Sequence, residues 1–432
     1  MKIRLQECGL NMQKNFYLNK NTLKYFDFLF VFAYFCDFCL LMLPTVFSSR
    51  KIALVYFIIR FLFNDRKIKI HKDHDWARYL IENIYIFIYT IILTIILGAI
   101  ADKYSLFPQL FYYILYGIIF PYIFIGLFSD EYHFSYMVIF SSLVQAVFVF
   151  FEFFNSNFKY WLIKFILQPG NISYLYKYRA TGLGLEGSAL SMFLWLGVFC
   201  CCYLLVNRRL CVSKSIFLSS IIVILVGAMF ISGRTGLYLS FIFLPFITFM
   251  IFFLKNNALK KFFIPVLFVG LIVGGVSFRN IDLPKIETLL SIWNRVSGII
   301  YDYENDATLK GLTRQHIPEF GFYTIVGTGL IRGRVESFYA MCDRGYVKTY
   351  MGLGLIVGIY FYFCFFKYGS KLILNIKDKK KKLLLLCCFC VLFVVEYKEA
   401  YFYEKYIFSA FFIVFSSLIN KLKDYQSEQY SN

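Results

Sequence analysis

The sequence predicts an all-α membrane protein, a polytopic bundle of transmembrane helices. Of its 432 residues, 59% are apolar and only 16% are charged, whereas soluble domains carry about 25% charged residues. Apolar runs of about 17–25 residues recur along the chain, and this is the length that a helix needs to cross a hydrocarbon core roughly 30 Å thick. One soluble core could not bury so many long runs. We therefore expect a single integral membrane domain over residues 1–432.

We expect about 12 spans, delimited by the polar residues that interrupt the apolar runs. The first run is too long for the core of a signal peptide and no small-residue cleavage site follows it, so it is an uncleaved span. In the fourth run, Pro108 is placed to begin a helix and Pro121 to kink it. The expected spans cover residues 25–47, 52–63, 79–101, 107–128, 134–154, 188–206, 216–231, 237–254, 262–278, 346–366, 383–395 and 406–419.

Basic residues set the expected orientation of these spans. Lys and Arg concentrate in the N-terminal tail and in alternate connections, and the positive-inside rule puts such segments in the cytoplasm. Both termini are then cytoplasmic, and the net charge of +19 follows from this rule rather than from nucleic-acid binding. The basic segments are residues 1–24, 64–78, 207–209, 255–261, 367–382 and 421–423.

Two long segments, 155–187 and 279–345, fall on the outer side. The second is the longest stretch that is not mostly apolar, and it carries charges of both signs. We expect it to cover a site for an anionic, lipid-linked substrate on the outer face and to offer a surface for glycan.

Cysteine usage argues against a metal centre and against a disulfide framework. Most of the 12 cysteines lie inside apolar runs, where Cys behaves as a small hydrophobe. Even the cluster at 387–390 has no His or carboxylate among it. Only Cys342 falls in a long outer segment, so we expect no metal and no disulfides.

The first of two glycine-containing motifs carries Arg179. It reads Tyr-Arg-Ala-Thr-Gly-Leu-Gly-Leu-Glu-Gly over residues 178–187, immediately before an expected span. The guanidinium suits bidentate contact with phosphate, and Gly182 and Gly184 would let the backbone approach a ligand closely. The alternative is an interfacial arginine that snorkels toward lipid headgroups.

The second motif is Ser-Gly-Arg-Thr-Gly, residues 232–236, in a very short connection between two expected spans. A charge held this close to apolar spans is costly and commonly functional. Arg234 is therefore a candidate ligand for an anionic substrate. A surface turn residue is the alternative.

The large outer segment contains a third glycine-rich stretch, residues 327–334, with Arg332 and Arg334. A platform for phosphate or sugar would have this composition, although the spacing is not that of a P-loop. A solvated basic turn is the alternative. His316 in the same segment is a further candidate substrate ligand.

These stretches together resemble a known family. The chain is similar to the O-antigen polymerase (Wzy) and O-antigen ligase superfamily in four features. They are an Arg-Ala-Thr-Gly-Leu stretch that opens a span (179–183), a Ser-Gly-Arg-Thr-Gly-Leu stretch between two spans (232–237), a large outer loop, and an Asp-x-x-Tyr before a Gly-rich span (343–346). The resemblance covers the architecture of almost the whole chain through short motifs.

The resemblance implies transfer of sugar chains between undecaprenyl-pyrophosphate carriers, without metal or other cofactor. In this reading Arg179 and Arg234 correspond to the two essential arginines of the family, and Asp343 marks the junction between loop and span. Ligases usually carry a His near that junction, whereas the nearest loop His of this chain, His316, lies well upstream. The departure favours a polymerase and leaves His316 without a family role.

Sugar transfer to a hydroxyl benefits from a general base that takes its proton. We expect Asp343 to have this role, with Glu186 as the second choice. The other carboxylates near the outer face are Glu336, Glu396 and Glu399.

Three ionisable residues, Asp27, Asp37 and Arg60, fall inside the first two expected spans. Charges at such positions either pair with one another or mark a polar path. The sequence leaves both alternatives open: structural ion pairs, or a path for a carrier head group.

The sequence thus predicts an O-antigen polymerase that joins repeat units on undecaprenyl pyrophosphate at the periplasmic face of a bacterial inner membrane. Its expected partners are the undecaprenyl-pyrophosphate-linked oligosaccharide and membrane lipids; a chain-length regulator protein is a candidate partner, and no nucleic acid is expected. One alternative is the ligase that moves the finished chain to lipid A core. Another is a flippase or transporter of the same lipid-linked oligosaccharide, against which the long outer segment weighs.

Overall fold

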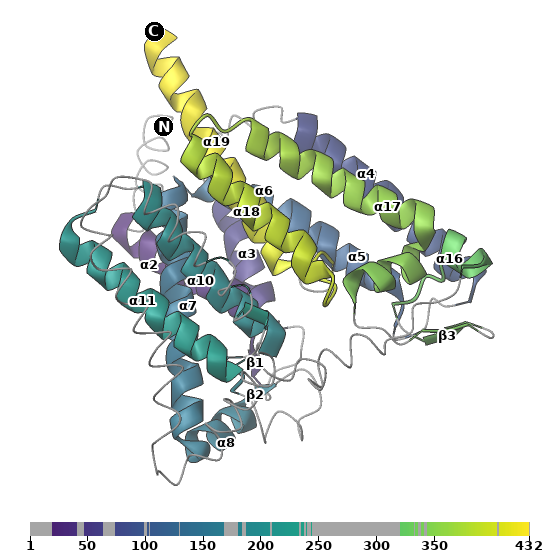
Figure 1. Ribbon diagram of the computed structural model, residues 1–432, viewed down its shortest axis with the longest axis horizontal. Coiled ribbons are helices and arrows are strands. Elements are labelled where there is room, and N and C mark those ends of the chain that lie inside the picture. The colour runs from purple at the N-terminus through teal and green to yellow at the C-terminus, as the bar shows by residue number, and fades with distance from the viewer. Residues whose placement is uncertain are drawn as a thin grey trace, which may run out of the picture.

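The computed structural model is a bundle of α-helices with two short two-stranded sheets (Figure 1). It describes residues 20–40, 47–63, 74–98, 102, 104–128, 130–167, 180–183, 187–207, 210–232, 235–236, 239, 243, 320–331, 333–335, 338–340, 344–403 and 406–431.

In the first half of the chain, α2 packs against α3 and α7, and α4 against α5. A short antiparallel pairing of β1 with β2 joins the α2–α3 connection to the chain that follows α8. The elements are α2 (Lys20–Cys36), β1 (Cys39–Leu40), α3 (Ser49–Leu62), α4 (His74–Ile96), α5 (Leu106–Tyr112), the π-helix η2 (Tyr113–Ile119), α6 (Phe120–Leu127), α7 (Glu131–Phe154), α8 (Ser156–Phe165) and β2 (Ile166–Leu167).

In the second half, α10 packs against α7, α11, α18 and α19, and α17 packs against α4 and α18. Figure 1 shows α4 and α17 side by side along one edge of the molecule. The elements are α10 (Gly187–Asn207), α11 (Val212–Ser232), α16 (Phe322–Val326), β3 (Gly333–Val335), β4 (Phe338–Ala340), α17 (Gly345–Leu374), α18 (Lys379–Glu396) and α19 (Ile407–Ser431).

Six helices within the described part of the chain are long and apolar enough to cross a membrane: His74–Ile96, Leu106–Leu127, Glu131–Phe154, Gly187–Asn207, Ser213–Ser232 and Gly345–Leu374. Large apolar side chains such as Ile92 on α4 and Ile359 on α17 are exposed, as surfaces that face lipid require. The expectation of a helical membrane protein is therefore confirmed.

Helix α10 forms the centre of the bundle. It is apolar on all sides, and such a helix must be surrounded by others; 89% of its apolar stretch is buried. The Trp195 ring lies 5.2 Å from the ring of Phe243 and 5.3 Å from that of Phe408. Cys200, like its two neighbours in sequence, is fully buried here, in agreement with the expected apolar role of the cysteines.

The expected fourth span is one continuous run of helix with a π-helical segment before Pro121. Proline has no N–H, and its ring clashes with the carbonyl four residues earlier. A π-helical turn accommodates this defect. Pro108 lies in the first turn of α5, as expected, whereas the helix continues through Pro121 after the π-helical segment.

Helix α17 is broken at Gly354, whose φ is 79° and ψ 171°. A Cβ there would lie 2.2 Å from the carbonyl oxygen of Ile325, so only glycine fits. The carbonyl groups left without helical partners at the break accept hydrogen bonds from the segment that follows α16. The N–H of Thr328 donates to the Met351 carbonyl at 2.8 Å, and that of Gly329 donates to the Gly352 carbonyl at 3.0 Å. Membrane proteins tolerate broken backbone only where other protein groups satisfy it in this way.

Several span boundaries shift from those expected. Helix α4 begins at His74 and α17 continues to Leu374, because each carries a polar end that pairs with the other. The outer turn between the first two expected spans, 25–47 and 52–63, ends earlier in the chain than expected, because α3 already begins at Ser49. The expected spans at 237–254 and 262–278 are almost wholly outside the described residues, as is the 279–319 part of the large segment.

Ion pairs gather where the segments expected in the cytoplasm meet. Lys371 of α17 lies 2.6 Å from Asp75 of α4, and Lys367 lies 3.2 Å from Glu82. At the start of α18, Lys381 lies 2.7 Å from the buried Glu131 of α7. We call this the basic end of the bundle and the opposite one the outer end. In Figure 1 the C-terminal end of α19 points away from α8, β1 and β2, which lie at the outer end.

Candidate functional site

Of the residues singled out by the sequence for chemistry, only the two carboxylates Glu396 and Glu399 have described side chains. Arg179, Arg234, Asp343, Glu186, Arg332 and His316 lie outside the described residues, as does Glu336, and Arg334 lies on β3, where only the backbone is described. Close neighbours in sequence of Arg179, Arg234 and Asp343 are described: Thr181, Thr235 and Arg344. The candidate site is built from these neighbours and from what they contact.

The segment that follows Arg179 is fastened to α7. The backbone N–H of Thr181 donates to Glu152 Oε2 at 2.9 Å, and both residues are buried. The Gln145 side chain forms two hydrogen bonds with the backbone of Leu183: it donates to the carbonyl at 3.0 Å and accepts from the N–H at 2.8 Å. These bonds fix the backbone of residues 181–183 at the outer end of α7.

Packing accounts for Gly182 in this segment. Its φ is +58°, and a Cβ would lie 2.5 Å from the Gln145 Oε1 and 3.5 Å from a methyl carbon of Leu190 on α10. The sequence suggested that this glycine lets the backbone approach a ligand. In the structure the close neighbour is Gln145, and the contact brings the segment onto the first turns of α10.

The segment that follows Arg234 docks on the same turns. The N–H of Gly236 donates to Ser191 Oγ at 2.5 Å, and a Cβ at Gly236 would lie 2.2 Å from the Ser191 carbonyl oxygen. Glycine at this position therefore permits a close approach of backbone to helix. It brings the buried Thr235 beside the N-terminal end of α10.

The α18–α19 turn supplies the third group of residues at this place. The Lys398 ammonium donates to Thr235 Oγ1, and the Ser188 hydroxyl on α10 donates to Glu399 Oε2 at 2.7 Å. Lys398 Nζ lies 4.0 Å from Glu399 Oε1. Three segments that are distant in sequence thus meet on residues 187–191, and we call this meeting place the α10 cap.

Sequence reasoning missed Lys398. It named Glu399 only as one carboxylate among several and gave the α18–α19 turn no role. A signal was present: Glu396, Lys398 and Glu399 place three charges in a short outer turn between apolar helices. Charges in such positions are commonly functional.

Glu396 has a structural role in this turn. It is fully buried and accepts from the N–H of Tyr401 at 2.6 Å, the N–H of Phe402 at 3.1 Å and the hydroxyl of Tyr362 at 2.8 Å. A Cβ at Gly345 would lie 2.3 Å from its Oε1, so α17 covers it closely. A carboxylate enclosed in this way holds the turn in shape and is not presented to a substrate.

The start of α17 brings two more cations to the outer end. Arg344, which follows Asp343, is 9% exposed, and Lys348 is 4% exposed. The Arg344 guanidinium carbon lies 5.0 Å from the centre of the Tyr397 ring, so Arg344 and Lys398 flank the same turn.

A partly buried ion pair connects the first two helices to this end as well. Arg50 Nη1 lies 2.7 Å from Asp37 Oδ2 and donates to the Tyr406 hydroxyl at 2.9 Å. Arg60 pairs with Asp27 within the membrane-spanning part of the hairpin. These contacts agree with the alternative that the charges form structural ion pairs. The partner of Asp37 is Arg50, which the sequence did not suggest.

The glycines of the 327–331 stretch have a packing role. Gly327 and Gly329 have φ of 102° and 69° and lie against the α17 break and Thr94. The carbonyl of Gly329 accepts from Leu106 at 2.7 Å. The expected platform for phosphate or sugar is thus, in its described part, a structural insert between α4, α5 and α17.

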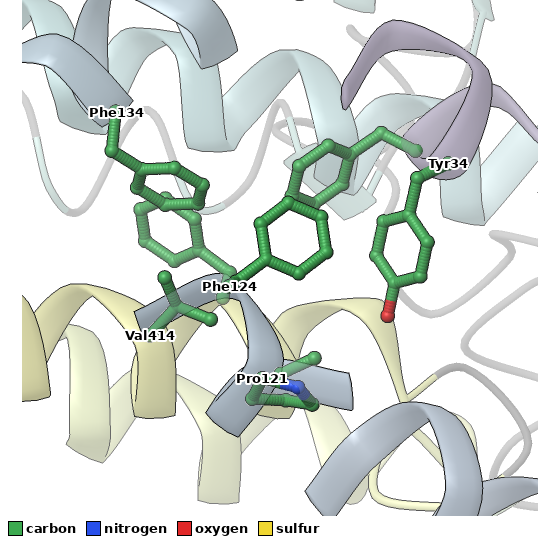
Figure 2. A pocket seen from close by; sticks show the side chains of 8 residues that line it. Tyr34, Pro121, Phe124, Phe134 and Val414 are labelled. Atoms are coloured by element: carbon green, nitrogen blue, oxygen red, sulfur yellow. The ribbon is translucent and has the colours of Figure 1, made fainter. Parts of the chain in front are cut away.

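A small apolar pocket lies between α2, α6, α7 and α19 (Figure 2). Its lining residues are Tyr34, Phe35, Pro121, Phe124, Phe134, Ala410, Phe411 and Val414. Ligand sites usually enclose about 300–1,000 Å³ and present a few polar groups. This pocket is a gap between aromatic side chains and lies apart from the α10 cap.

The α10 cap can bind an anion. The N-terminus of a helix carries partial positive charge and favours negative groups, and Lys398 adds a full positive charge beside it. Among the residues that the structure describes, no group of three or more His, Cys, Asp or Glu side chains could hold a metal ion.

Comparison with protein families, with curated proteins and with solved structures finds no match to this chain.

Proposed function

We propose that the chain is a membrane glycosyltransferase of the O-antigen polymerase type. It joins oligosaccharide repeat units carried on undecaprenyl pyrophosphate at the periplasmic face of a bacterial inner membrane. The proposal includes about 12 spans with both termini in the cytoplasm and a large periplasmic loop over residues 279–345.

The observation that carries the proposal is the α10 cap. Thr181 lies two positions after Arg179 and Thr235 one position after Arg234. Thr181 is bonded to Glu152 of α7 and is followed by Gly182, which lies near Leu190 of α10, and Thr235 is followed by Gly236, which is bonded to Ser191 of α10. Consecutive Cα atoms are about 3.8 Å apart, so the proposal assigns both arginines to this end of the bundle. Two sequence motifs about 55 residues apart would then act on one substrate.

In the proposed reaction, Arg179 and Arg234 bind the diphosphate of the donor. The bond between the sugar anomeric carbon and the diphosphate oxygen breaks, and the diphosphate leaves with the electron pair. Fixed cations lower the energy of the charge that develops there. The hydroxyl of the acceptor sugar forms the new glycosidic bond and gives its proton to a carboxylate, for which Asp343 is the first candidate.

Replacement of either arginine tests this function. We expect Arg179→Ala and Arg234→Ala to abolish surface polymer longer than one repeat unit, since each removes a ligand of the leaving group, while the protein stays in the membrane. Polymer length is read from surface polysaccharide on a gel, with membrane content checked by immunoblot. Arg78→Ala is the matched control, because Arg78 is an exposed arginine at the basic end, paired with Glu82.

Long chains in either arginine variant would contradict the proposal. Deletion of the whole gene separates the alternatives. Single repeat units on the lipid acceptor indicate a polymerase, a complete lack of repeats on that acceptor indicates a ligase, and units trapped at the cytoplasmic face indicate a flippase.

A further inference from the structure

Helix α8 begins where the α7 span ends. Asn155 caps the end of α7 and the start of α8, and its side chain accepts from the N–H of Phe158 at 3.1 Å. Helix α7 has 24 residues, so at about 1.5 Å per residue it is longer than a hydrocarbon core roughly 30 Å thick. Figure 1 shows α8 turned away from the axis of α7. Its place is therefore the level of the lipid headgroups, at the outer end of the bundle.

The inner face of α8 is packed against the bundle. Leu162, Ile166 and Leu183 form a small buried cluster, against which Phe32 of α2 and Phe148 of α7 pack. Directly after α8, the pairing of β2 with β1 ties the chain to the α2–α3 connection. Helix α8 is thus fastened along one side, which fixes the direction of its opposite side.

The outer face of α8 is aromatic and carries one lysine. Trp161 and Phe165 are 52% and 41% exposed, and their ring centres lie 4.9 Å apart. Lys164 is also exposed, and residues spaced by three and four positions share one side of a helix. Tryptophan is enriched at the headgroup level of membranes, and lysine there keeps its ammonium among the headgroups. The face therefore has the composition of a membrane interface.

This face continues the lipid-facing surface of α7. Phe151, in the last turn of α7, is 56% exposed, and its ring lies 5.6 Å from that of Phe158 in the first turn of α8. Lipid that covers Phe151 thus has α8 beside it. The ten-residue helix contains no carboxylate, so the charge of Lys164 complements that of anionic headgroups.

We propose that α8 is a membrane-interface helix whose outer face, Trp161, Lys164 and Phe165, docks on lipid with anionic headgroups. The two rings enter the boundary between headgroups and acyl chains, where interfacial helices bury their apolar side. The ammonium of Lys164 pairs with phosphate oxygens. Such an interface requires only that the chain is a helical membrane protein, so it is independent of the proposed transfer reaction. Through Leu183, it sets the depth of the segment that approaches α10.

Fluorescence quenching of the full-length chain in vesicles tests the depth of Trp161. The chain has four Trp, so the Trp161 signal is the wild-type emission minus that of Trp161→Phe, a variant that keeps an aromatic ring. The vesicles contain phosphatidylcholine and phosphatidylglycerol, brominated either near the headgroup or at the end of the acyl chain. We expect bromine near the headgroup to quench this signal more strongly, and iodide in the water to quench it weakly. Trp161→Tyr takes the place of Trp161→Phe if that variant does not fold.

Replacement of Lys164 tests the preference for anionic lipid. Brominating only the phosphatidylglycerol or only the phosphatidylcholine gives the relative association of the two lipids at Trp161. Lys164→Gln should lower the preference for phosphatidylglycerol about fivefold, the effect of one basic residue near a charged surface. Lys164→Arg keeps the charge and should keep the preference. Lys379→Gln is the control, because it removes the same charge from an exposed position at the basic end.

Other results would overturn the inference. Strong quenching by iodide with none by brominated lipid would mean that the outer face of α8 lies in water. Quenching by neither would mean that protein covers it, either another part of this chain or a second copy. A stronger effect of bromine at the chain end would place α8 among the acyl chains. An unchanged preference for phosphatidylglycerol in folded Lys164→Gln would mean that the face does not recognise anionic headgroups.

Discussion

At the scale of single residues, buried carboxylates determine how the outer end is built. Glu152 fastens the segment after Arg179, and Glu396 closes the α18–α19 turn. Both would be costly to bury alone, and hydrogen bonds offset part of that cost. Glu152 accepts two, both from Thr181 to Oε2, and Glu396 accepts three. These buried polar residues therefore serve mainly to hold backbone segments in place through hydrogen bonds.

Glu396→Gln should destabilise the protein by about 2 kcal/mol. The carboxylate accepts hydrogen bonds on both oxygens, whereas an amide has one acceptor oxygen and turns an NH₂ group toward a donor. The measurement is chemical or thermal unfolding in detergent. Asp75→Asn serves as the control, because the Asp75–Lys371 pair is exposed and exposed pairs contribute about 0–1 kcal/mol.

A Glu396→Gln protein as stable as the wild type would show that the charge of this carboxylate does not hold the turn.

At the scale of elements, the broken helix α17 and the inserted segment 327–331 form one unit. Thr349 Oγ1 lies 2.8 Å from the hydroxyl of Tyr362 across the break, so the short outer half of α17 folds back on the long half. Tyr362 in turn donates to Glu396. The break, the insert and the α18–α19 turn are therefore connected by a continuous series of hydrogen bonds that leads to the outer end.

Gly354→Ala should destabilise this unit by about 3–5 kcal/mol. Alanine is disfavoured at a φ of 79°, and its Cβ would meet backbone atoms of residues 325–327. These residues are held in place because Thr328 and Gly329, which follow them, donate to carbonyls of α17. We expect a lower yield of monodisperse protein and faster trypsin cleavage. Gly321→Ala is the control, because a Cβ there meets nothing within 4 Å and its φ is extended. Equal behaviour of the two variants would mean that the break is not needed.

At the scale of the whole molecule, the two ends of the bundle differ in chemistry. The basic end carries lysines paired with acidic residues: the exposed Lys371 with Asp75 of α4, and the partly buried Lys381 with Glu131 of α7. At the outer end, cations such as Arg50 and Arg344 are buried. The positive-inside rule predicts that the basic end faces the cytoplasm. Under the proposed function, the opposite end is the one that would bind lipid-linked substrates.

Cysteine labelling tests this orientation. In a variant that keeps Cys211 alone, between α10 and α11, a membrane-impermeant maleimide should react only from the cytoplasmic side. In a cysteine-free background, Gly321→Cys should react from the outside, since Gly321 is exposed and belongs to the large outer segment. Labelling of both sites from the same side would contradict the topology.

The rate of Cys211 labelling should also depend on pH in a defined way. The hydrogen bond with the Ser213 hydroxyl, followed by one with the Lys214 backbone, lowers the pKa of the Cys211 thiol. A lower pKa gives more of the reactive thiolate at a given pH. The rate should therefore reach its half-maximum at a lower pH than for an ordinary cysteine, whose pKa is about 8.5.

The sequence by itself determined the class of the protein, because apolar run length and the distribution of Lys and Arg are properties of the chain alone. The place of Pro108 in the fourth span and the apolar role of the cysteines were predictable for the same reason. The sequence also singled out the segments around Arg179 and Arg234. The function it suggested remains a proposal.

Only the tertiary structure decided what these segments contact. Gly182, Gly236 and Gly329 could serve a ligand or a close packing contact, and the structure shows the packing partner in each case. Lys398 and Thr235 are 163 positions apart, and no local pattern links them. Their meeting depends on how α10, α11 and α18 pack, and such long-range packing is set by many small contacts that no single stretch of sequence encodes.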